Sequence, residues 1–152
     1  MELNVIQKTV SELLNTHKIV VCTAPRGSGK TLLSNHIKKT YEKLGLKVMK
    51  YGFDGVKWIH PSQNDIDIDY QVKIYDDIDF IKNAESQLEL DLSFFNIKKI
   101  LLIGTQRDGL IAKYAKRYPS VHFNGYVCFS ENDINEIKSI LSIKEFEAQY
   151  SL

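Results

Sequence analysis

The 152 residues, 43% of them hydrophobic and 26% charged, have the length and composition of one globular domain. An aromatic content of 11% excludes an intrinsically disordered chain, and no apolar run approaches the roughly 20 residues that a transmembrane helix needs. The net charge of +1 is unevenly distributed, because residues 1–60 carry ten Lys and Arg against four Asp and Glu, whereas residues 61–97 carry two against nine.

Apolar residues repeat at helical spacing in five segments of the chain. The first segment ends near His17, and the second starts near Lys30 and is closed by Gly45, a residue suited to the turn that ends a helix. Pro119 stops the fourth segment because proline cannot continue a helix. The predicted helices have their apolar positions within 3–14, 32–44, 78–92, 110–115 and 131–143.

Short apolar runs rich in β-branched residues separate these helices, as expected of strands buried on both faces. Over 66–74 apolar and polar residues alternate, which also indicates a strand, and 52–64 reads as a loop because it holds Gly55 and Pro61. The predicted strands cover 19–23, 48–51, 66–74, 100–103 and 121–129. Strands that alternate with helices predict an α/β fold with a parallel sheet covered on both faces.

The two cysteines, Cys22 and Cys128, lie far apart in apolar strand-like runs. This placement is typical of buried, reduced thiols rather than of a disulfide or a metal site. No basic segment followed by an apolar stretch opens the sequence, so no secretory signal is expected. We therefore expect a cytoplasmic protein, or one inside a host cell if the chain is viral.

The strongest motif is the segment 24–31, APRGSGKT, which fits a phosphate-binding loop with Ala24 at the first glycine position. Glycines let backbone N–H groups turn inward around phosphates, the lysine reaches the β and γ oxygens, and the next hydroxyl binds Mg²⁺. Alanine suits the first position where φ is negative. A chance glycine-rich turn is disfavoured because a buried strand precedes the motif and a helix follows it. The residues expected to bind the nucleotide are Pro25, Arg26, Gly27, Ser28, Gly29, Lys30, Thr31 and Leu32, with Thr31 also a magnesium ligand.

A second motif is the strand that ends in Asp76 and Asp77. In phosphate-loop ATPases the first carboxylate of such a pair holds Mg²⁺ and the second polarises the attacking water. The alternative is a turn followed by a helix N-cap. Asp77 stands where many such ATPases have glutamate, so binding is expected with more certainty than fast hydrolysis.

A third motif, Thr105-Gln106-Arg107, follows the buried strand 100–103. The carboxyl ends of parallel strands face the ligand crevice, so these side chains are candidates to reach the γ-phosphate or its attacking water. A polar strand-to-helix turn is the alternative. Elsewhere, Asp65, Asp67 and Asp69 imitate a calcium loop but Tyr70 replaces its required glycine, and the histidines have no ligand-like spacing.

With these motifs in this order, the chain resembles the additional-strand class of P-loop ATPases over about residues 18–142. The resemblance implies one three-layer P-loop NTPase domain over 1–152, with a mainly parallel five-stranded sheet of order 5-1-4-3-2 and no full lid domain. It also implies ATP and Mg²⁺ as cofactors. Gln106 and Thr105-Gln106-Arg107 look like the sensor of the FtsK-HerA translocases, whereas Thr105, Arg107 and the aspartate pair look like the NB-ARC domain of STAND ATPases. AAA+ proteins often carry an arginine finger where Arg117 stands.

Three functions follow from the resemblance. The first is a motor or remodelling ATPase that acts on nucleic acid in translocation, packaging or replication; the second is a slow nucleotide-gated switch or scaffold; the third is a small-molecule kinase, disfavoured by the lack of an arginine-rich lid segment. A homo-oligomer or a partner protein is expected if Arg117 acts across an interface. A lysine-rich face is a candidate for DNA or RNA, and a solvated helix face is its alternative. Its members are Lys38, Lys39, Lys43, Lys47 and Lys50.

Overall fold

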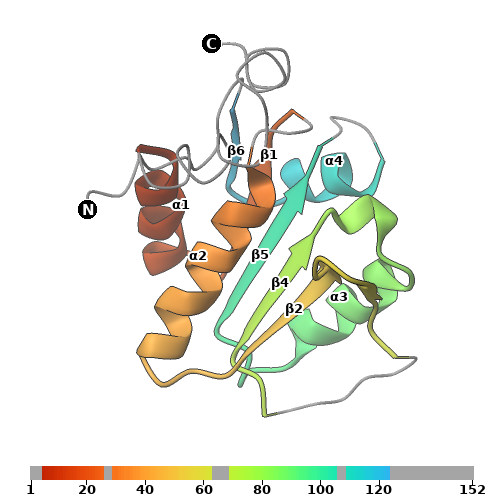
Figure 1. The fold of residues 1–152 in the computed structure, drawn as a ribbon, viewed down its shortest axis with the longest axis horizontal. Coiled ribbons are helices and arrows are strands. Elements are labelled where there is room, and N and C mark those ends of the chain that lie inside the picture. The colour runs from red at the N-terminus through yellow and green to blue at the C-terminus, as the bar shows by residue number, and fades with distance from the viewer. Residues whose placement is uncertain (1–4, 26–28, 63–68, 106–108, 124–152) are drawn as a thin grey trace.

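The helices and strands of the computed structural model follow the predicted alternation along the chain (Figure 1). The structure describes residues 5–25, 29–62, 69–105 and 109–123. The helices are α1 (Val5–Thr16), α2 (Lys30–Lys43), a 3₁₀ turn η1 (Ile78–Phe80), α3 (Ala84–Ser93) and α4 (Leu110–Ala115). The strands are β1 (Ile19–Thr23), β2 (Val48–Phe53), β3 (Trp58–Ile59), β4 (Val72–Asp76), β5 (Lys99–Gly104) and β6 (Ser120–His122). The predicted helix over 131–143 lies outside the described residues.

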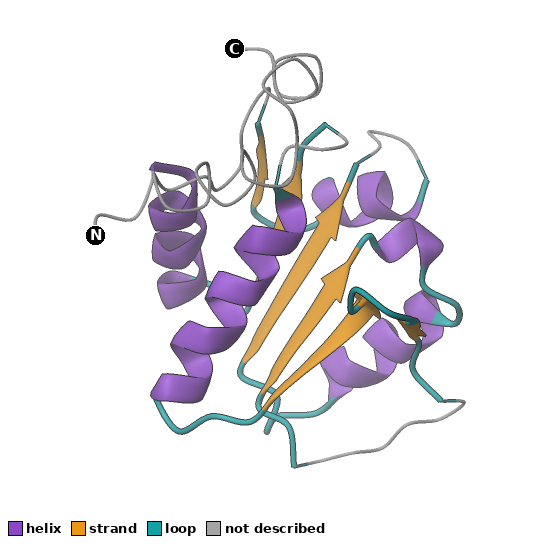
Figure 2. Ribbon diagram, viewed as in Figure 1, coloured by secondary structure: helices purple, strands orange, loops and turns teal. Residues whose placement is uncertain are grey.

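The strands form one sheet of order β3-β2-β4-β5-β1-β6 (Figure 2). Every pair is parallel except β2 with β3, and Ile19 of β1 lies opposite Ile100 of β5. Taken from β6, the five parallel strands have the predicted order 5-1-4-3-2, which is confirmed. Strand β3 is an addition within the segment predicted to be a loop, where Phe53 pairs with Trp58 across a short antiparallel hairpin.

Each face of the sheet is covered by helices, so the core has two halves (Figure 1). On one face Leu14 of α1 and Leu33 and Ile37 of α2 pack in one buried cluster with the sheet. On the other face, Leu88 of α3 and Ile111 of α4 belong to a second cluster. Burying one such side chain stabilises the fold by about 1.5–3 kcal/mol, so both layers contribute to holding the helices against the sheet.

Strand β4 differs from the prediction in its start and in its burial. It begins at Val72, while Tyr70 precedes it outside the strand and residues 63–68 lie outside the described part of the chain. All five of its residues are buried, including Lys73, which is 1% exposed. The alternation of apolar and polar residues therefore does not mark a solvent-facing side of this strand.

A polar network explains how Lys73 is buried. Its Nζ donates a hydrogen bond of 2.8 Å to the Tyr51 hydroxyl and lies 3.5 Å from Oδ1 of Asp91 on α3. The Asp91 carboxylate also accepts hydrogen bonds from Tyr75 and from the Gln87 amide. Burial, and then the nearby charge of Asp91, raise the pKa of Tyr75. A buried charge is tolerated when it is paired and hydrogen-bonded in this way.

The single helix predicted over 78–92 is broken in two, and this part of the prediction is wrong. The 3₁₀ turn η1 ends at Phe80, and Asn83 adopts a left-handed conformation with φ of 61° before α3 begins at Ala84. The turn and the helix bury Ile78, Ile81 and Leu88 in the same cluster, so the apolar spacing alone suggested one continuous helix.

Two smaller expectations, on Gly45 and on Cys22, are met by the described residues. Gly45 has a φ of +83° just after α2, and the Gly45 and Leu46 N–H groups donate to the carbonyls of Glu42 and Tyr41. Cys22 is buried with a free thiol, and burial raises its pKa to about 12, whereas Cys128 lies outside the described residues. Within the described part of the chain, no helix combines the length and apolar character required to cross a membrane.

Candidate functional site

The carboxyl ends of β1, β4 and β5 meet at one edge of the sheet, because these strands are parallel neighbours (Figure 1). Their last residues are Thr23, Asp76 and Gly104. The segment 24–31 follows β1 and leads into α2 at the same edge. A crevice at this edge is the usual place for a ligand in an open α/β sheet.

The described ends of the phosphate-loop segment have the backbone that the motif requires. Gly29 has a φ of +89° directly before Lys30, the first residue of α2, and this left-handed conformation favours glycine. Ala24 is buried and is not among the described non-glycine residues with positive φ, which are Asp77 and Asn83. Alanine at the first glycine position therefore fits the backbone without strain.

Lys30 is buried, and its side chain reaches back to Pro25. Its Nζ donates a hydrogen bond of 2.9 Å to the carbonyl of Pro25. An ammonium group carries a positive charge and three N–H donors, a chemistry that suits phosphate oxygens. The lysine of the motif thus lies close to Pro25, near the start of the phosphate-loop segment.

Asp76, the last residue of β4, contacts the phosphate-loop helix α2. Its Oδ2 accepts hydrogen bonds from the hydroxyls of Thr31, at 3.1 Å, and Ser34, at 3.2 Å. Its Oδ1 is buried and has no hydrogen-bond partner among the described residues. Burial raises the pKa of Asp76, while the charge of Lys50 opposes that shift.

The oxygens of Thr31 and Asp76 fit a magnesium ion. Mg²⁺ prefers hydroxyl, carboxylate and water oxygens, and is usually held by one or two carboxylates together with substrate phosphates. A buried carboxylate oxygen without a partner, Oδ1 of Asp76, needs such a ligand, because leaving a buried acceptor unsatisfied costs about 1–3 kcal/mol. The two predicted metal ligands therefore lie together.

Lys50 of β2 belongs to this site, although the sequence suggested an exposed position for it. Its Nζ lies 3.6 Å from Oδ2 of Asp76 and donates a hydrogen bond of 2.9 Å to Asn35 of α2. Burial lowers the pKa of Lys50, and Asp76 opposes that shift. Only the register of β2 against β4, which the sequence does not state, places Lys50 on the same face as Asp76. Lys50 is therefore removed from the predicted lysine-rich face.

Asp77 has an uncommon backbone conformation and a hydrogen-bond partner just after the neighbouring strand β5. Its φ and ψ are 58° and 59°, a left-handed conformation that is uncommon outside glycine and that clusters at functional sites. Its Oδ1 accepts a hydrogen bond of 3.2 Å from the hydroxyl of Thr105, which follows β5. The second and third motifs of the sequence thus meet at this contact.

The remaining nucleotide-binding candidates fall into two groups. Pro25 is exposed at the start of the loop, and Leu32 is half-buried and packs against the core on the α1–α2 face. Five predicted residues lie outside the described part of the chain: Arg26, Gly27, Ser28, Gln106 and Arg107.

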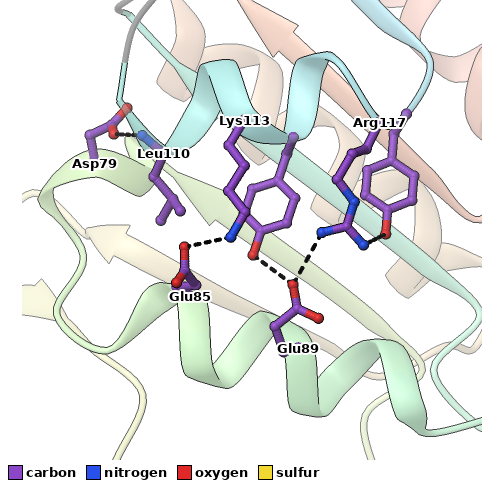
Figure 3. A network of polar contacts seen from close by, with 8 residues as sticks. Asp79, Glu85, Glu89, Leu110, Lys113 and Arg117 are labelled. Atoms are coloured by element: carbon purple, nitrogen blue, oxygen red, sulfur yellow. Dashed lines mark hydrogen bonds and ion pairs between the residues drawn. The ribbon is translucent and has the colours of Figure 1, made fainter.

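Arg117, the predicted arginine finger, lies just after α4 and contacts α3 (Figure 3). Its guanidinium donates to Oε1 of Glu89 at 3.4 Å and to the Tyr118 hydroxyl at 3.3 Å, and about half of its side chain is exposed. Neighbouring contacts join the same two helices: Lys113 pairs with Glu85, and the Tyr114 hydroxyl donates to Glu89. The described contacts of Arg117 are thus with residues of the same chain, and its side chain remains accessible.

The predicted lysine-rich face is retained in part on α2. Lys39 and Lys43 are exposed, and Lys38 is half-buried beside a pocket described below. Lys47 is exposed and lies 4.0 Å from Asp69 and over the ring of Tyr70. The exposed positions leave both the nucleic-acid hypothesis and the solvated-face alternative in place.

Comparison with known proteins gives a likeness at the level of the fold. No protein-family model matches the chain, and no curated protein matches it. A solved structure described as a DNA replication initiation factor is similar, with a TM-score of 0.56 and 19% sequence identity. The match covers 94% of this chain and 50% of that one, so this chain spans about half the length of the similar protein. The fold, a mixed sheet flanked by helices, is P-loop NTPase-like.

Proposed function

We propose that the chain binds and hydrolyses ATP in a Mg²⁺-dependent reaction and that this ATPase acts on nucleic acid. The observation that carries the proposal is the contact between Thr31 and Asp76, because it unites the phosphate-loop helix with an acidic strand end that has an unsatisfied carboxylate oxygen. This arrangement suits phosphoryl transfer, in which the protein catalyses mainly by positioning the reacting groups and stabilising charge.

Each residue of the site has a role in this proposal. Lys30 neutralises phosphate oxygens, and Thr31 and Asp76 would hold Mg²⁺, which neutralises charge that develops on the transferring group. Asp77 accepts a hydrogen bond from the attacking water and orients it, and Thr105 fixes the Asp77 carboxylate. The candidate residues Gln106, Arg107 and Arg117 would add contacts to the γ-phosphate.

The nucleic-acid part of the proposal has two supports. The similar solved structure is described as a DNA replication initiation factor, and exposed lysines lie along α2, the helix that begins at the phosphate-loop segment. A switch with slow hydrolysis is the second candidate function, and the ion pair between Lys50 and Asp76 favours it. A lysine paired with the metal carboxylate competes with Mg²⁺ and would slow turnover.

ATP turnover measured alone and with single-stranded DNA, duplex DNA or RNA tests the proposal. Stimulation by a nucleic acid selects the motor or remodelling function, tight nucleotide retention with negligible turnover selects the switch, and phosphate transfer to a nucleoside selects a kinase. Lys30→Ala is the control, because it should abolish triphosphate binding in a protein that still folds. Unchanged ATP affinity in folded Lys30→Ala would contradict the proposed site.

A further inference from the structure

An exposed aromatic patch lies on and beside the β2–β3 hairpin, next to the candidate site. We define it by four residues: Phe53, Trp58, His60 and Phe80. Trp58 is at its centre, with ring centroids 5.9 Å from Phe53, 6.0 Å from His60 and 6.3 Å from Phe80. Phe53, Trp58 and Phe80 are 39–59% exposed. Folded proteins usually bury large aromatic rings, and a cluster of exposed ones is typical of an interaction site.

The hairpin holds this patch in a fixed shape. Phe53 pairs with Trp58 across the two strands, and the Asp54 N–H donates to the carbonyl of Lys57 at 3.0 Å. The Asp54 carboxylate accepts hydrogen bonds of 2.8 Å from the N–H groups of Val56 and Lys57, which lower its pKa. Gly55 takes the positive φ of +99° that the turn requires. The rings are therefore presented by an ordered turn rather than by a loose loop.

A lysine-lined pocket of about 430 Å³ adjoins the patch. We call it the lysine pocket; among its lining residues are Lys38, Lys50, Asn35, Thr31, Phe53 and Asp54. Asp54 is the only acidic residue among the described lining residues, and its charge is engaged by the two N–H groups of the turn. Lys57 of the hairpin turn and Lys82 are exposed residues beside the patch, and the backbone N–H of Lys82 donates to the His60 ring. The pocket thus suits an anion beside a flat apolar group.

We propose that the aromatic patch and the lysine pocket together bind single-stranded nucleic acid, with bases stacked on the rings and a backbone phosphate held by Lys38 and Lys50. This combination of a positive groove and stacking rings is how proteins bind single strands without regard to sequence. Several neighbouring rings match a strand of successive bases better than a single nucleotide. The inference rests on the proposed function for its nucleic-acid ligand and adds where that ligand binds and in what form.

The position of the lysine pocket would couple binding of the nucleic acid to binding of ATP at the candidate site. The lysine pocket shares Thr31 and Lys50 with the metal site, and Lys50 lies 3.6 Å from Asp76. A backbone phosphate in the pocket would compete with Asp76 for the Lys50 ammonium and so free the carboxylate for Mg²⁺. Strand binding and Mg-dependent ATP binding should therefore strengthen each other, as reciprocal coupling requires.

Trp58 makes the proposal directly measurable because it is the only tryptophan of the chain. An oligothymidylate of about 12 nucleotides, titrated at about 50 mM salt, should quench the Trp58 emission as bases stack. An abasic oligomer of the same length and charge should bind less tightly and leave the emission nearly unchanged. Anisotropy of an end-labelled oligomer measures binding independently of Trp58.

Matched variants separate stacking from general attraction. Trp58→Ala and Phe80→Ala should each weaken oligomer binding by about 5- to 150-fold, the range for loss of one stacked base. Lys38→Gln should weaken it and reduce its salt dependence. Phe95→Ala and Lys98→Gln are the controls and should bind normally, because this aromatic–lysine pair is exposed outside the patch, just before β5.

Each contrary result identifies what has failed. Oligomer binding with unchanged Trp58 emission, or with normal affinity in both Trp58→Ala and Phe80→Ala, overturns the inference and leaves the exposed lysines of α2 as the binding surface. Equal affinity for thymidine monophosphate and for the oligomer overturns a single-stranded ligand in favour of a mononucleotide. A Trp58 emission that changes with protein concentration in the absence of oligomer overturns the inference in favour of self-association through the patch. Normal ATP binding without oligomer binding overturns the inference but not the ATPase. Loss of ATP binding overturns the proposed function whatever Trp58 reports.

Discussion

Two adjacent aspartates have different surroundings, and their replacement should have different effects. Asp76 is buried against Thr31 and Ser34, whereas Asp77 is half-buried and bonded to Thr105. Asp77→Asn should retain ATP binding and lower kcat by about 10²–10⁴-fold, because it removes the carboxylate that we propose to orient the attacking water. Asp76→Asn should also weaken the dependence of ATP binding on Mg²⁺. Binding by calorimetry at several Mg²⁺ concentrations, together with turnover, checks both.

Asparagine is a suitable replacement at position 77 for a structural reason. Asp77 has a φ of 58°, and asparagine tolerates this left-handed conformation better than most residues. The variant therefore changes the charge and keeps the backbone. Equal turnover in wild type and Asp77→Asn would remove Asp77 from the mechanism, while Asp76 would keep its place as a metal ligand.

Lys73 is the buried cation of the core, and its removal should be costly. Its ammonium lies 3.5 Å from Asp91, and both side chains are 1% exposed. Lys73→Met should lower the free energy of unfolding by about 3–5 kcal/mol, because Asp91 would remain as an uncompensated buried charge. Adding Asp91→Asn should recover part of this loss, since the amide still offers an oxygen to Tyr75. Urea unfolding of the single and double variants measures the coupling.

An exposed ion pair gives the comparison for Lys73. Lys113 and Glu85 lie 3.1 Å apart with side chains about half exposed, so Lys113→Met should change stability by only about 0–1 kcal/mol. If Lys73→Met were no more destabilising than Lys113→Met, the buried network would not carry the stability assigned to it.

At the scale of elements, the separation of β2 and β4 depends on Gly52. A Cβ at this position would lie 2.6 Å from the carbonyl oxygen of Asp76, and its φ is +132°. Gly52→Ala should destabilise the fold by about 1–3 kcal/mol through overpacking, in addition to backbone strain. It should also weaken ATP binding, since the displaced residue is Asp76, the proposed metal ligand. Urea unfolding and calorimetry measure the two effects.

Gly55 isolates the backbone part of that effect. It has a φ of +99° in the hairpin turn, but a Cβ there would meet nothing within 4 Å. Gly55→Ala should therefore cost only the strain of a left-handed alanine, about 1–2 kcal/mol. Similar losses in both variants would show that the contact with Asp76 has no influence.

Elements also differ in how well the sequence predicts them. The runs 19–22 and 100–103 are apolar throughout and each follows a lysine, so β1 and β5 are evident. The break after η1 is not, because Ile78, Ile81 and Leu88 keep the spacing of one helix while Asn83 turns the backbone. Two-residue strand β3 is missed because its ladder depends on the hairpin rather than on its own composition.

The candidate site shows the same difference between local and long-range information. The sequence singles out Thr31 through the phosphate-loop motif, and Asp76 and Asp77 because they follow an apolar strand-like run. Lys50 is not singled out as a site residue, because its contact with Asp76 depends on the pairing of β2 with β4 across the sheet. The partner of Lys73 is hidden for the same reason, since Asp91 reaches it from α3. Sequence periodicity identifies faces, but tertiary pairing decides which polar groups meet.

At the scale of the whole molecule, Arg117 tests whether hydrolysis needs a neighbouring copy. If Arg117 acts across an interface, Arg117→Ala should bind ATP normally and hydrolyse it about 10³–10⁵-fold more slowly. Mixing Arg117→Ala with Lys30→Ala should restore turnover, because one variant supplies the intact nucleotide site and the other the arginine. Steady-state turnover over a range of protein concentrations measures this.

The local contact of Arg117 requires a separate control. Glu89→Gln removes the carboxylate that accepts from Arg117 and retains the guanidinium, so it should preserve the in-trans activity. A monomeric protein whose turnover per chain is independent of concentration would exclude the in-trans role. Arg107, acting within its own chain, would then be the better candidate.

The pairing of β1 with β5 has a consequence for the synthesis of this protein. Ile19 lies opposite Ile100, 81 positions later, and the other neighbour of β1 is β6, which is made later still. At about 5–20 residues per second, β1 waits about 4–16 s on the ribosome for its first partner. Until Gly104 has emerged, the phosphate loop has no sheet to support it, so ATP cannot assist folding of the nascent chain. During that interval the apolar run of β1 lacks both of its strand neighbours, whereas β2 can already pair with β3 and β4, so β1 is the segment on which a chaperone would act.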